Sequence, residues 1–357
     1  MKERLTRLQR LIVEQGLDAL LVRQDENVRY LSGFTGGSDG VLIVTGDRAL
    51  LATDFRYYEQ VRQQAPDWEL VKLSGRMAPA LAAQLADLKV QRVGFEPHAL
   101  TVETLEQWRA AAPALAWVGT SDLVEQLRVV KDAGEVALIQ EAVRIADEAM
   151  AHISEWIRPG VTEREVSWEL EMYMRTHGAE ALSFTTIVGS GPNGAMSHAV
   201  TSERPIQEGD PIVIDMGARY EGYCSDITRS FCLGHASDAY LQVWNWVLKA
   251  QLAAEQAAKA GITGFALDAV ARDMIYGAGY EGKFGHGLGH GVGLAIHESP
   301  RASYTSSDTL LANTIVTIEP GIYDPAWGGV RIEDMVLITE NGCRVLTQAA
   351  KIPVIGR

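Results

Sequence analysis

Two stretches of this chain each carry a pair of acidic residues at the spacing of a β-hairpin. The first pair is Asp215 and Asp226. Alternating apolar residues predict strands over Pro211–Ala218 and Tyr223–Leu233 with a turn at Tyr220–Gly222. If that turn is centred between Tyr220 and Glu221, Asp215 and Asp226 lie directly opposite each other. Like charges directly opposite on a sheet are destabilising, and the apolar flanks indicate burial. Some positive charge must therefore offset the repulsion between the two carboxylates.

A pair of glutamates repeats this arrangement near the C-terminus. Strands are predicted over Thr314–Glu319 and Val330–Thr339, joined by a loop at Pro320–Gly329, and Glu319 and Glu333 lie symmetrically about that loop. One such pair has a plain explanation, because exposed acidic pairs on edge strands are commoner than metal sites. Two pairs in one half of a chain are harder to explain without a bound cation.

Three of the eight histidines fall between the two hairpins, at His286, His290 and His297. The glycines around them argue against an α-helix and indicate tightly turning backbone. A lone histidine in such a segment would be a packed residue with one hydrogen bond. Beside four carboxylates, at least one of the three is interpreted as a metal ligand.

Four carboxylates and one imidazole suit two divalent cations that share ligands. This hard, oxygen-rich donor set favours Mn²⁺, with Co²⁺ or Zn²⁺ as alternatives. Two cations about 3.5–4 Å apart can hold a bridging hydroxide that is nucleophilic at neutral pH. The expected cofactor is therefore a pair of divalent metal ions, and the expected chemistry is hydrolysis.

The elements that position these groups divide into two predicted domains, residues 1–125 and 126–357. Helical and strand patterns alternate through the first domain, which predicts an α/β unit around a mixed sheet. In the second domain, capping-box patterns begin two helices, and from Phe184 onward strands and glycine-rich loops predominate. The helices predicted in this domain lie at 134–157, from Thr162 onward, at 239–260 and at 264–278.

The composition is that of an ordinary globular protein, with 47% apolar and 22% charged residues and a formal net charge of −14. The negative charge disfavours nucleic acid and anionic membrane surfaces as partners. No apolar run approaches the roughly 18 residues that span a bilayer, and the N-terminal segment predicts an amphipathic helix instead of a signal peptide. The three cysteines lack metal-finger spacing. These features predict a cytoplasmic protein.

In order along the chain, Asp215, Asp226, His290, Glu319 and Glu333 resemble the ligand set of the pita-bread metallopeptidases. The pattern is most similar to the proline-specific branch, prolidase (Xaa-Pro dipeptidase) and Xaa-Pro aminopeptidase. The motifs DMGARYEGYCSDITRSF, GHGLGHGVGLAIHESPR, IEPGIY and GVRIED resemble the catalytic domain, and ENVRYLSGFTG and TDFRYYEQ resemble a creatinase-type N-terminal domain. The resemblance implies an α/β creatinase-like N-terminal domain and an α+β pita-bread catalytic domain with a curved antiparallel sheet.

The resemblance also implies roles around the metal ions. His198 is similar to the histidine that contacts the scissile carbonyl or the tetrahedral intermediate. His297 is similar to a hydrogen-bond donor to developing negative charge, and Glu319 to the acceptor of the water proton. Three further positions are similar to residues that line the substrate pocket or orient the substrate: His286, Tyr323 and Arg331.

Arg331 has an alternative interpretation, and the residue before His198 departs from the pattern of the family. Arg331 lies two residues before Glu333 and could simply neutralise the acidic cluster. Ser197 stands directly before His198, where several relatives have proline. Because proline would restrict the backbone there, the loop that bears His198 is expected to be less rigid.

The implied activity is hydrolysis of the N-terminal Xaa-Pro bond of dipeptides or short peptides by a homodimeric enzyme. A methionine-aminopeptidase-like exopeptidase shares the ligand set, but the roughly 120 residues before the catalytic domain and the HESP motif argue against it. Creatinase shares both domains yet works without this metal set. A non-catalytic paralogue that binds a partner is a further alternative, although all five ligand positions and both key histidines are present.

Overall fold

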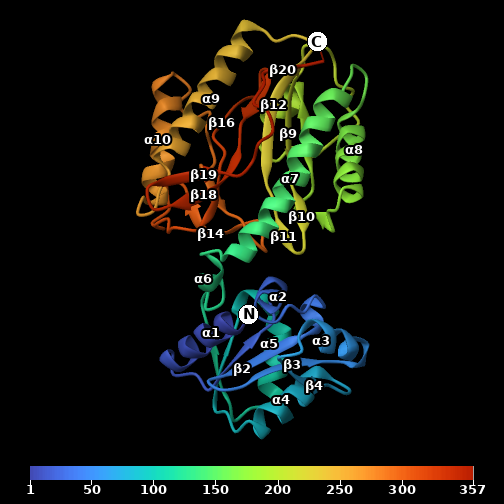
Figure 1. The fold of residues 1–357 in the computed structure, drawn as a ribbon, viewed down its shortest axis with the longest axis vertical. Coiled ribbons are helices and arrows are strands. Elements are labelled where there is room, and N and C mark those ends of the chain that lie inside the picture. The colour runs from blue at the N-terminus through green and yellow to red at the C-terminus, as the bar shows by residue number, and fades with distance from the viewer. Residues whose placement is uncertain (357) are drawn as a thin grey trace. The chain divides into compact units, whose positions relative to one another are not determined.

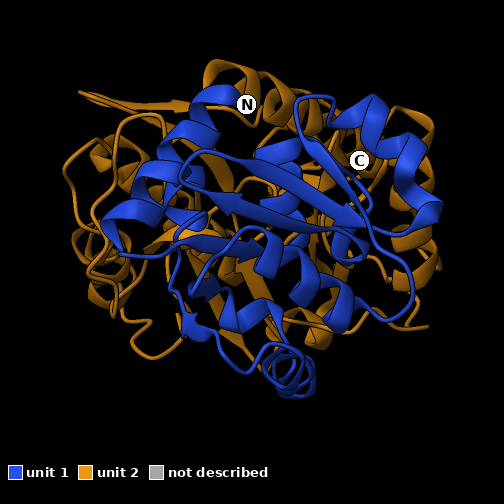
Figure 2. Cartoon of the chain, turned by 90° about the horizontal axis from the view of Figure 1, so that it is seen from below, with its two compact units in different colours: residues 1–128 blue, residues 129–357 orange. Residues whose placement is uncertain are grey.

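Residues 1–356 are described by the computed structural model, in which the chain divides after Arg128 into two units (Figures 1 and 2). The first unit comprises residues 1–128, and the second begins at Val129. Among the described residues, no helix has both the length and the apolar character that crossing a bilayer requires.

The first unit is built on a six-stranded sheet in the order β4-β3-β2-β1-β5-β6. Its central strand β1 pairs antiparallel with β2 and parallel with β5, so the predicted mixed sheet is confirmed. Both β1 and β2 are wholly buried, which suits their continuous apolar runs. The strands are β1 (Ala19–Val22), β2 (Val41–Thr45), β3 (Ala49–Thr53), β4 (Glu69–Lys72), β5 (Arg92–Phe95) and β6 (Ala116–Gly119).

Helices of the first unit connect and cover these strands. The amphipathic helix predicted at the N-terminus is present and buries Leu8 and Ile12. The α-helices are α1 (Lys2–Glu14), α2 (Asp25–Ser32), α3 (Tyr58–Gln64), α4 (Met77–Asp87), α5 (Val102–Ala111) and α6 (Glu125–Arg128). Short 3₁₀ helices lie at η1 (Gly37–Asp39), η2 (Phe55–Tyr57) and η3 (Pro97–Ala99).

Four long helices flank the strands of the second unit, with α7 and α8 on one side and α9 and α10 on the other (Figure 1). They are α7 (Ala133–Trp156), α8 (Glu163–Thr176), α9 (Asp238–Ala257) and α10 (Gly264–Gly277), each close to its predicted range. Reciprocal capping boxes begin α7 and α8, as the sequence patterns predicted: Asp132 with Glu135, and Thr162 with Glu165.

The strands of the second unit form several small sheets around two apolar cores. One core packs α7 and α8 against the sheet β20-β12-β9-β8, and the other packs α9 and α10 against the sheet β14-β13-β15-β18-β19. The strands are β7 (Ala181–Leu182), β8 (Ile187–Ser190), β9 (Pro211–Met216), β10 (Ala218–Tyr220), β11 (Tyr223–Cys224), β12 (Ile227–Leu233), β13 (Gly289–Gly291), β14 (Glu298–Ala302), β15 (Ile315–Ile318), β16 (Gly321–Asp324), β17 (Gly328–Arg331), β18 (Asp334–Thr339), β19 (Gly342–Val345) and β20 (Val354–Ile355). Most of the pairings are antiparallel, as predicted.

The first carboxylate hairpin has a different register from the one predicted. Asp215 pairs with Thr228 and not with Asp226, because the turn lies at Glu221 and Gly222. Both turn residues have positive φ, 44° and 82°, which produces a two-residue turn of type I′ geometry. The observed partner of Asp215 therefore lies two residues after the predicted one. Because side chains on a strand alternate between faces, a shift of two residues leaves Asp215 and Asp226 on the same face, as diagonal neighbours.

The second hairpin keeps the predicted symmetry but contains an additional pair of strands. Ile318 pairs with Asp334 and Gly321 pairs with Arg331, so the ladders on either side place Glu319 and Glu333 at matching positions. The segment predicted as a loop is wrong in part, because most of it forms β16 and the start of β17. The glycines and prolines of this segment are typical of loops, so the sequence did not predict the short antiparallel ladder of β16 and β17.

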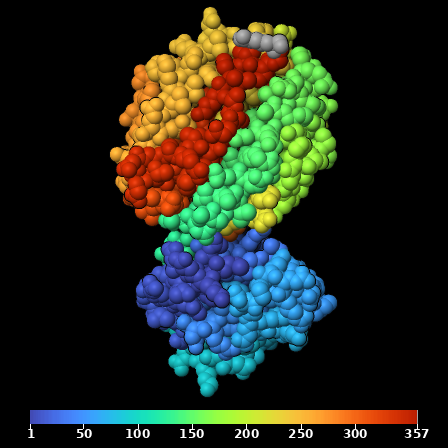
Figure 3. Space-filling view, viewed as in Figure 1, coloured from blue at the N-terminus to red at the C-terminus, as the bar shows by residue number. Residues whose placement is uncertain are grey.

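The C-terminal segment lies between α7 and α9, and Figure 3 shows it as the red surface between green and gold helices. Its backbone amides at Gln348 and Ala349 donate to Asp147 of α7 at 2.7 and 2.8 Å. Lys351 Nζ donates to Gln251 Oε1 of α9 at 2.9 Å. These bonds join the two helical layers across the strands.

We predict that Gly222→Ala destabilises the second unit, because an L-residue with a side chain costs roughly 1–2 kcal/mol in the left-handed region. Urea unfolding followed by circular dichroism should show a lower midpoint for this unit. Gly342→Ala is the matched control, since Gly342 has no left-handed φ and open space where a Cβ would lie. Equal urea midpoints for the two variants would show that the left-handed conformation at Gly222 does not require glycine for stability.

Candidate metal centre

A cavity of about 670 Å³ in the second unit is lined by almost all of the predicted site residues. Asp226, Glu319 and Glu333 lie between strands. Asp215 lies near the end of β9, and His290 is the central residue of β13, where the register of the ladder shifts. The predicted residues on its lining are His198, Asp215, Asp226, His286, His290, His297, Glu319, Arg331 and Glu333. Tyr323 lies just behind the lining, where its hydroxyl is 2.9 Å from His286 Nε2.

The closest group in this cavity is Asp226, His290 and Glu333, whose candidate ligand atoms all lie within 4.8 Å of one another. His290 Nε2 is 3.6 Å from Asp226 Oδ2 and 3.4 Å from Glu319 Oε1. The carboxylate of Asp215 is bound to the Arg331 guanidinium at the edge of this group. The chain thus brings four carboxylates and one imidazole to a common centre.

Burial controls the protonation of these groups. It raises the pKa of Asp226 and of Glu333 well above the usual range, and neighbouring carboxylates raise both pKa values further. It also raises the pKa of Glu319 to about 7. Burial lowers the pKa of His290 to about 3, so its imidazole is neutral and keeps a lone pair for a ligand bond.

The donor set fits divalent cations. Asp215 Oδ1 is buried without a hydrogen-bond partner, which is unusual for a carboxylate oxygen in a folded protein. Among the described residues, Arg331 is the one guanidinium that pairs with the four carboxylates of the site, closely with Asp215 and at 4.0 Å with Glu319 Oε2. An unpaired buried oxygen, excess carboxylates and a neutral imidazole are the groups that hard divalent metal ions bind.

Arg331 directs its donors toward protein groups. Its guanidinium donates to Asp215 Oδ2, to Thr228 Oγ1 at 3.0 Å, to Tyr323 Oη at 2.9 Å and to the carbonyl of Ser197 at 3.1 Å. The side chain is only 4% exposed. This arrangement favours the neutralising role over substrate orientation, the two alternatives for this residue.

Two threonines support the carboxylates and were not identified from the sequence. Thr228 Oγ1 donates to Glu333 Oε2 at 2.6 Å, and Thr317 Oγ1 donates to Glu319 Oε1 at 3.2 Å. Thr317 Oγ1 also accepts the backbone amide of His290 at 3.1 Å. Thr228 lies two residues after Asp226, and Thr317 lies two residues before Glu319. Because side chains two residues apart on a strand point to the same face, this spacing could have indicated that each threonine faces the cavity with its neighbouring carboxylate.

The histidines with predicted substrate roles face the cavity. His198 and His297 are exposed, and the His297 ring lies 4.3 Å from that of His290 in an edge-on arrangement. Directly after His297, the Glu298 carboxylate accepts a hydrogen bond from the buried ammonium of Lys131. This ion pair fixes the backbone that carries His297.

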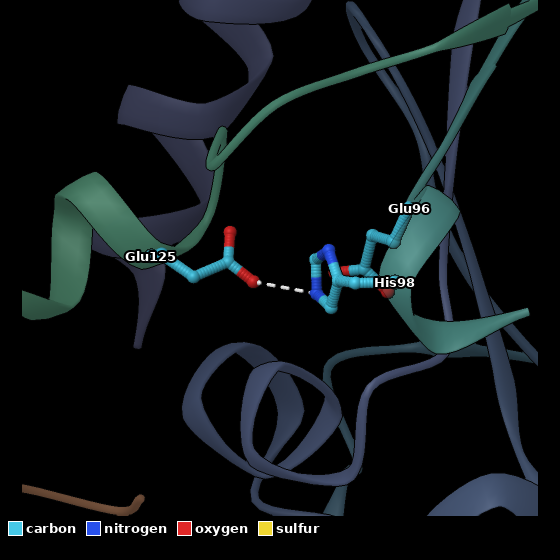
Figure 4. Close-up of side chains that lie close together, drawn as sticks. All are labelled: Glu96, His98 and Glu125. Carbon is cyan, nitrogen blue, oxygen red and sulfur yellow. Dashed lines mark ion pairs between the residues drawn. The ribbon is translucent and has the colours of Figure 1, made fainter. Parts of the chain in front are cut away.

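A second group of potential ligands lies in the first unit, where Glu96, His98 and Glu125 approach one another (Figure 4). His98 Nε2 is 3.2 Å from Glu125 Oε1. The amide of Asn27 donates to both carboxylates at 2.6 Å, so its hydrogens already lie between them. Glu96 also accepts the backbone amides of Arg23 and Gln24. This network is satisfied by hydrogen bonds and does not need a cation.

The sequence matches the model of Metallopeptidase family M24 over residues 137–340. The chain belongs to this family. Residues 4–130 match the Creatinase/Prolidase N-terminal domain, so the predicted creatinase-like and pita-bread fold is confirmed. As a member of the family the protein is a metallo-exopeptidase.

Similar proteins cover nearly the whole chain. An Xaa-Pro dipeptidase structure from Bacillus anthracis is 43% identical with a TM-score of 0.96, covering 99% of both chains. An X-Pro aminopeptidase structure from Thermotoga maritima is 39% identical with a TM-score of 0.90, covering 98% of this chain and 100% of the other. The Xaa-Pro dipeptidase of Pyrococcus furiosus is 38% identical over 98% of this chain and 99% of its own.

The buried carboxylates predict that Mn²⁺ stabilises the protein more at high pH. The folded-state pKa values of Asp226, Glu319 and Glu333 are raised, so their contribution to the stability of the metal-free protein is present at low pH and is lost as the pH rises through about 7 for Glu319. A cation binds the deprotonated carboxylates, so its contribution grows over the same range.

Chelator-treated protein should therefore gain more melting temperature from Mn²⁺ at pH 8 than at pH 5.5, measured by scanning calorimetry. Asp226→Asn is the comparison variant, and its gain should be smaller at both pH values. An equal or larger gain at pH 5.5 for the unmodified protein would contradict this account of the site.

Proposed function

We propose that this protein hydrolyses the peptide bond before proline at the N-terminus of dipeptides or short peptides, using two divalent metal ions. The observation that carries the proposal is the convergence of four carboxylates, His290 and two exposed histidines on one cavity. The names of the similar proteins, two Xaa-Pro dipeptidases and an X-Pro aminopeptidase, support the proline specificity.

Asp215, Asp226, His290, Glu319 and Glu333 would hold the cations. The chemistry that two divalent ions would supply there is activation of a water molecule and polarisation of the scissile carbonyl. The oxygen-rich ligand set favours Mn²⁺, with Co²⁺ or Zn²⁺ as alternatives.

Glu319 is the group that accepts the proton from the attacking water. In the metal-free protein burial raises the pKa of Glu319 to about 7. A bound cation would lower that pKa and leave a carboxylate that can accept a proton. Thr317 Oγ1 donates to one carboxylate oxygen of Glu319 and so orients it. The same proton can then pass to the departing prolyl nitrogen.

His297 and His198 act on the carbonyl of the residue before proline. Each ring is exposed at the cavity, where an N–H can donate to the oxygen as negative charge develops on it. Burial lowers the pKa of His297, so this donor is a neutral imidazole N–H at neutral pH. An Xaa-Pro bond has no amide N–H, so recognition has to come from such contacts to the carbonyl and from the cavity shape.

The alternatives are less well supported. The match to the Creatinase/Prolidase N-terminal domain over residues 4–130 disfavours a methionine-aminopeptidase-like enzyme. A non-catalytic binding protein would have no need for five metal-binding groups on one cavity. A homodimeric state and a cytoplasmic location, the remaining expectations from the sequence, stay predictions.

Hydrolysis of Ala-Pro tests the proposal. Purified protein that is stripped with a chelator and reloaded with Mn²⁺ should release free proline from Ala-Pro, and the stripped protein should not. Ala-Ala is the control substrate and should be cleaved far more slowly. Comparison with Ala-Pro-Ala separates a dipeptidase from an aminopeptidase. Equal cleavage of Ala-Ala and Ala-Pro, or no cleavage of either proline substrate, would refute the proposed specificity.

We predict that His297→Ala lowers kcat by roughly 10²–10³-fold, the usual effect of removing one donor to a developing oxyanion. Metal content by mass spectrometry should be unchanged, since the five proposed ligands remain. His235→Ala is the control, because the His235 side chain is 71% exposed and lies outside the cavity lining. An unchanged kcat for His297→Ala would remove this residue from the mechanism.

A further inference from the structure

The loop that carries His198 is closed at its base by one buried carboxylate. Glu163, the first residue of α8, is fully buried at 0% exposure. The His198 loop, residues 190–202, leaves β8 at Ser190, passes through η4 (Gly191–Ala195) and returns at Ser202. Both ends of the loop bind Glu163. Compact surface loops with adjoining ends are frequently functional.

The hydrogen bonds at this base are numerous and short. Ser190 donates from N and Oγ to Glu163 Oε1, both at 2.8 Å. Ser202 donates from N and Oγ to Oε2, at 3.0 and 2.6 Å. Asn193 Nδ2 donates to both oxygens, at 3.0 and 3.2 Å. The charge of Glu163 also lies at the N-terminus of α8, where the helix dipole favours an anion.

The tip of the same loop is held from the metal centre. Arg331 Nη1 donates to the carbonyl of Ser197, the residue before His198, at 3.1 Å. His198 itself is exposed, and within residues 1–356 its ring forms no hydrogen bond. The location of the His198 ring therefore depends on the backbone of the loop, which Glu163 fixes at its base and Arg331 fixes near its tip.

We propose that Glu163 is a positioning residue for His198 and aligns it with the substrate carbonyl. This inference rests on the proposed function, because it takes His198 as a group that contacts the scissile carbonyl. Glu163 compensates for Ser197, which leaves the loop without the conformational restriction that a proline would give it.

The geometry specifies a substitution that must disturb the loop. The two backbone amides bind different oxygens of Glu163, that of Ser190 to Oε1 and that of Ser202 to Oε2. In Glu163→Gln one of these oxygens becomes an NH₂ group, which cannot accept. Whichever way the glutamine amide turns, one backbone N–H faces another donor, and one end of the loop is released.

A double-mutant cycle tests the proposal. Glu163→Gln should lower kcat for Ala-Pro by about 10- to 100-fold, the loss that a displacement of about 1 Å can cause. In a His198→Ala background the same substitution should lower kcat by about twofold or less, because the group it positions is gone. Metal content should be the same in all four proteins. Glu165→Gln, on the same helical turn, is the matched control and should leave kcat unchanged, because glutamine keeps the capping box.

Ser202→Ala provides a second cycle if Glu163→Gln folds poorly. It removes one donor to Glu163 and retains the backbone N–H, so a smaller loss of kcat is expected with the same dependence on His198. If either substitution lowers kcat by the same factor with His198 as in the His198→Ala background, the proposal is overturned, since the substitution would then act on general stability and not through His198. A wild-type protein that cleaves no Xaa-Pro substrate would instead overturn the proposed function itself.

Discussion

The crowding of four carboxylates, of which Asp226 and Glu333 are buried, around one neutral imidazole is the constraint on which the catalytic unit depends. Burial of a charged group is costly unless an opposite charge or several hydrogen bonds compensate. The described residues supply one guanidinium, from Arg331, together with threonine hydroxyls. Asp215 Oδ1 still lacks a partner, and burial raises the pKa values of Asp226 and Glu333. A folded chain keeps such an arrangement when bound cations balance it.

The remaining architecture holds these carboxylates in place before a cation arrives. Behind the cavity, the Asp334 carboxylate is buried and accepts hydrogen bonds from Arg229 at 2.8 Å and from Gln251 at 3.0 Å, and it forms an ion pair with Lys351. Arg229 also donates to the carbonyl of Glu333. The hairpin that carries Glu333 is thereby bonded to α9 and to the C-terminal segment. Such support reduces the reorganisation that metal binding requires and fixes the geometry that hydrolysis needs.

Residue types and spacing were enough to predict the long helices and the two carboxylate pairs that line the cavity, whereas the resemblance to the pita-bread family supplied His198, His290 and His297. Capping boxes and apolar periodicity are local signals, so Asp132 and Thr162 marked helix starts correctly. The hairpin register was wrong because Glu221 adopts a left-handed conformation that its residue type does not indicate. Glu163 could not be identified either, since a glutamate in the first turn of a helix is ordinarily exposed. Its partners lie 27 to 39 residues away, beyond the range of any local pattern.

Equilibrium dialysis of the purified, chelator-treated protein against Mn²⁺ tests the central claim most directly, because it counts bound metal without reference to activity. The account predicts two tightly bound ions per chain for the unmodified protein and fewer for Asp226→Asn at an unchanged fold. The Glu96, His98 and Glu125 group of the first unit should add none, so Glu125→Gln should leave the count as it is. A protein that binds no Mn²⁺, or an Asp226→Asn variant that binds as much as the unmodified chain, would contradict the account.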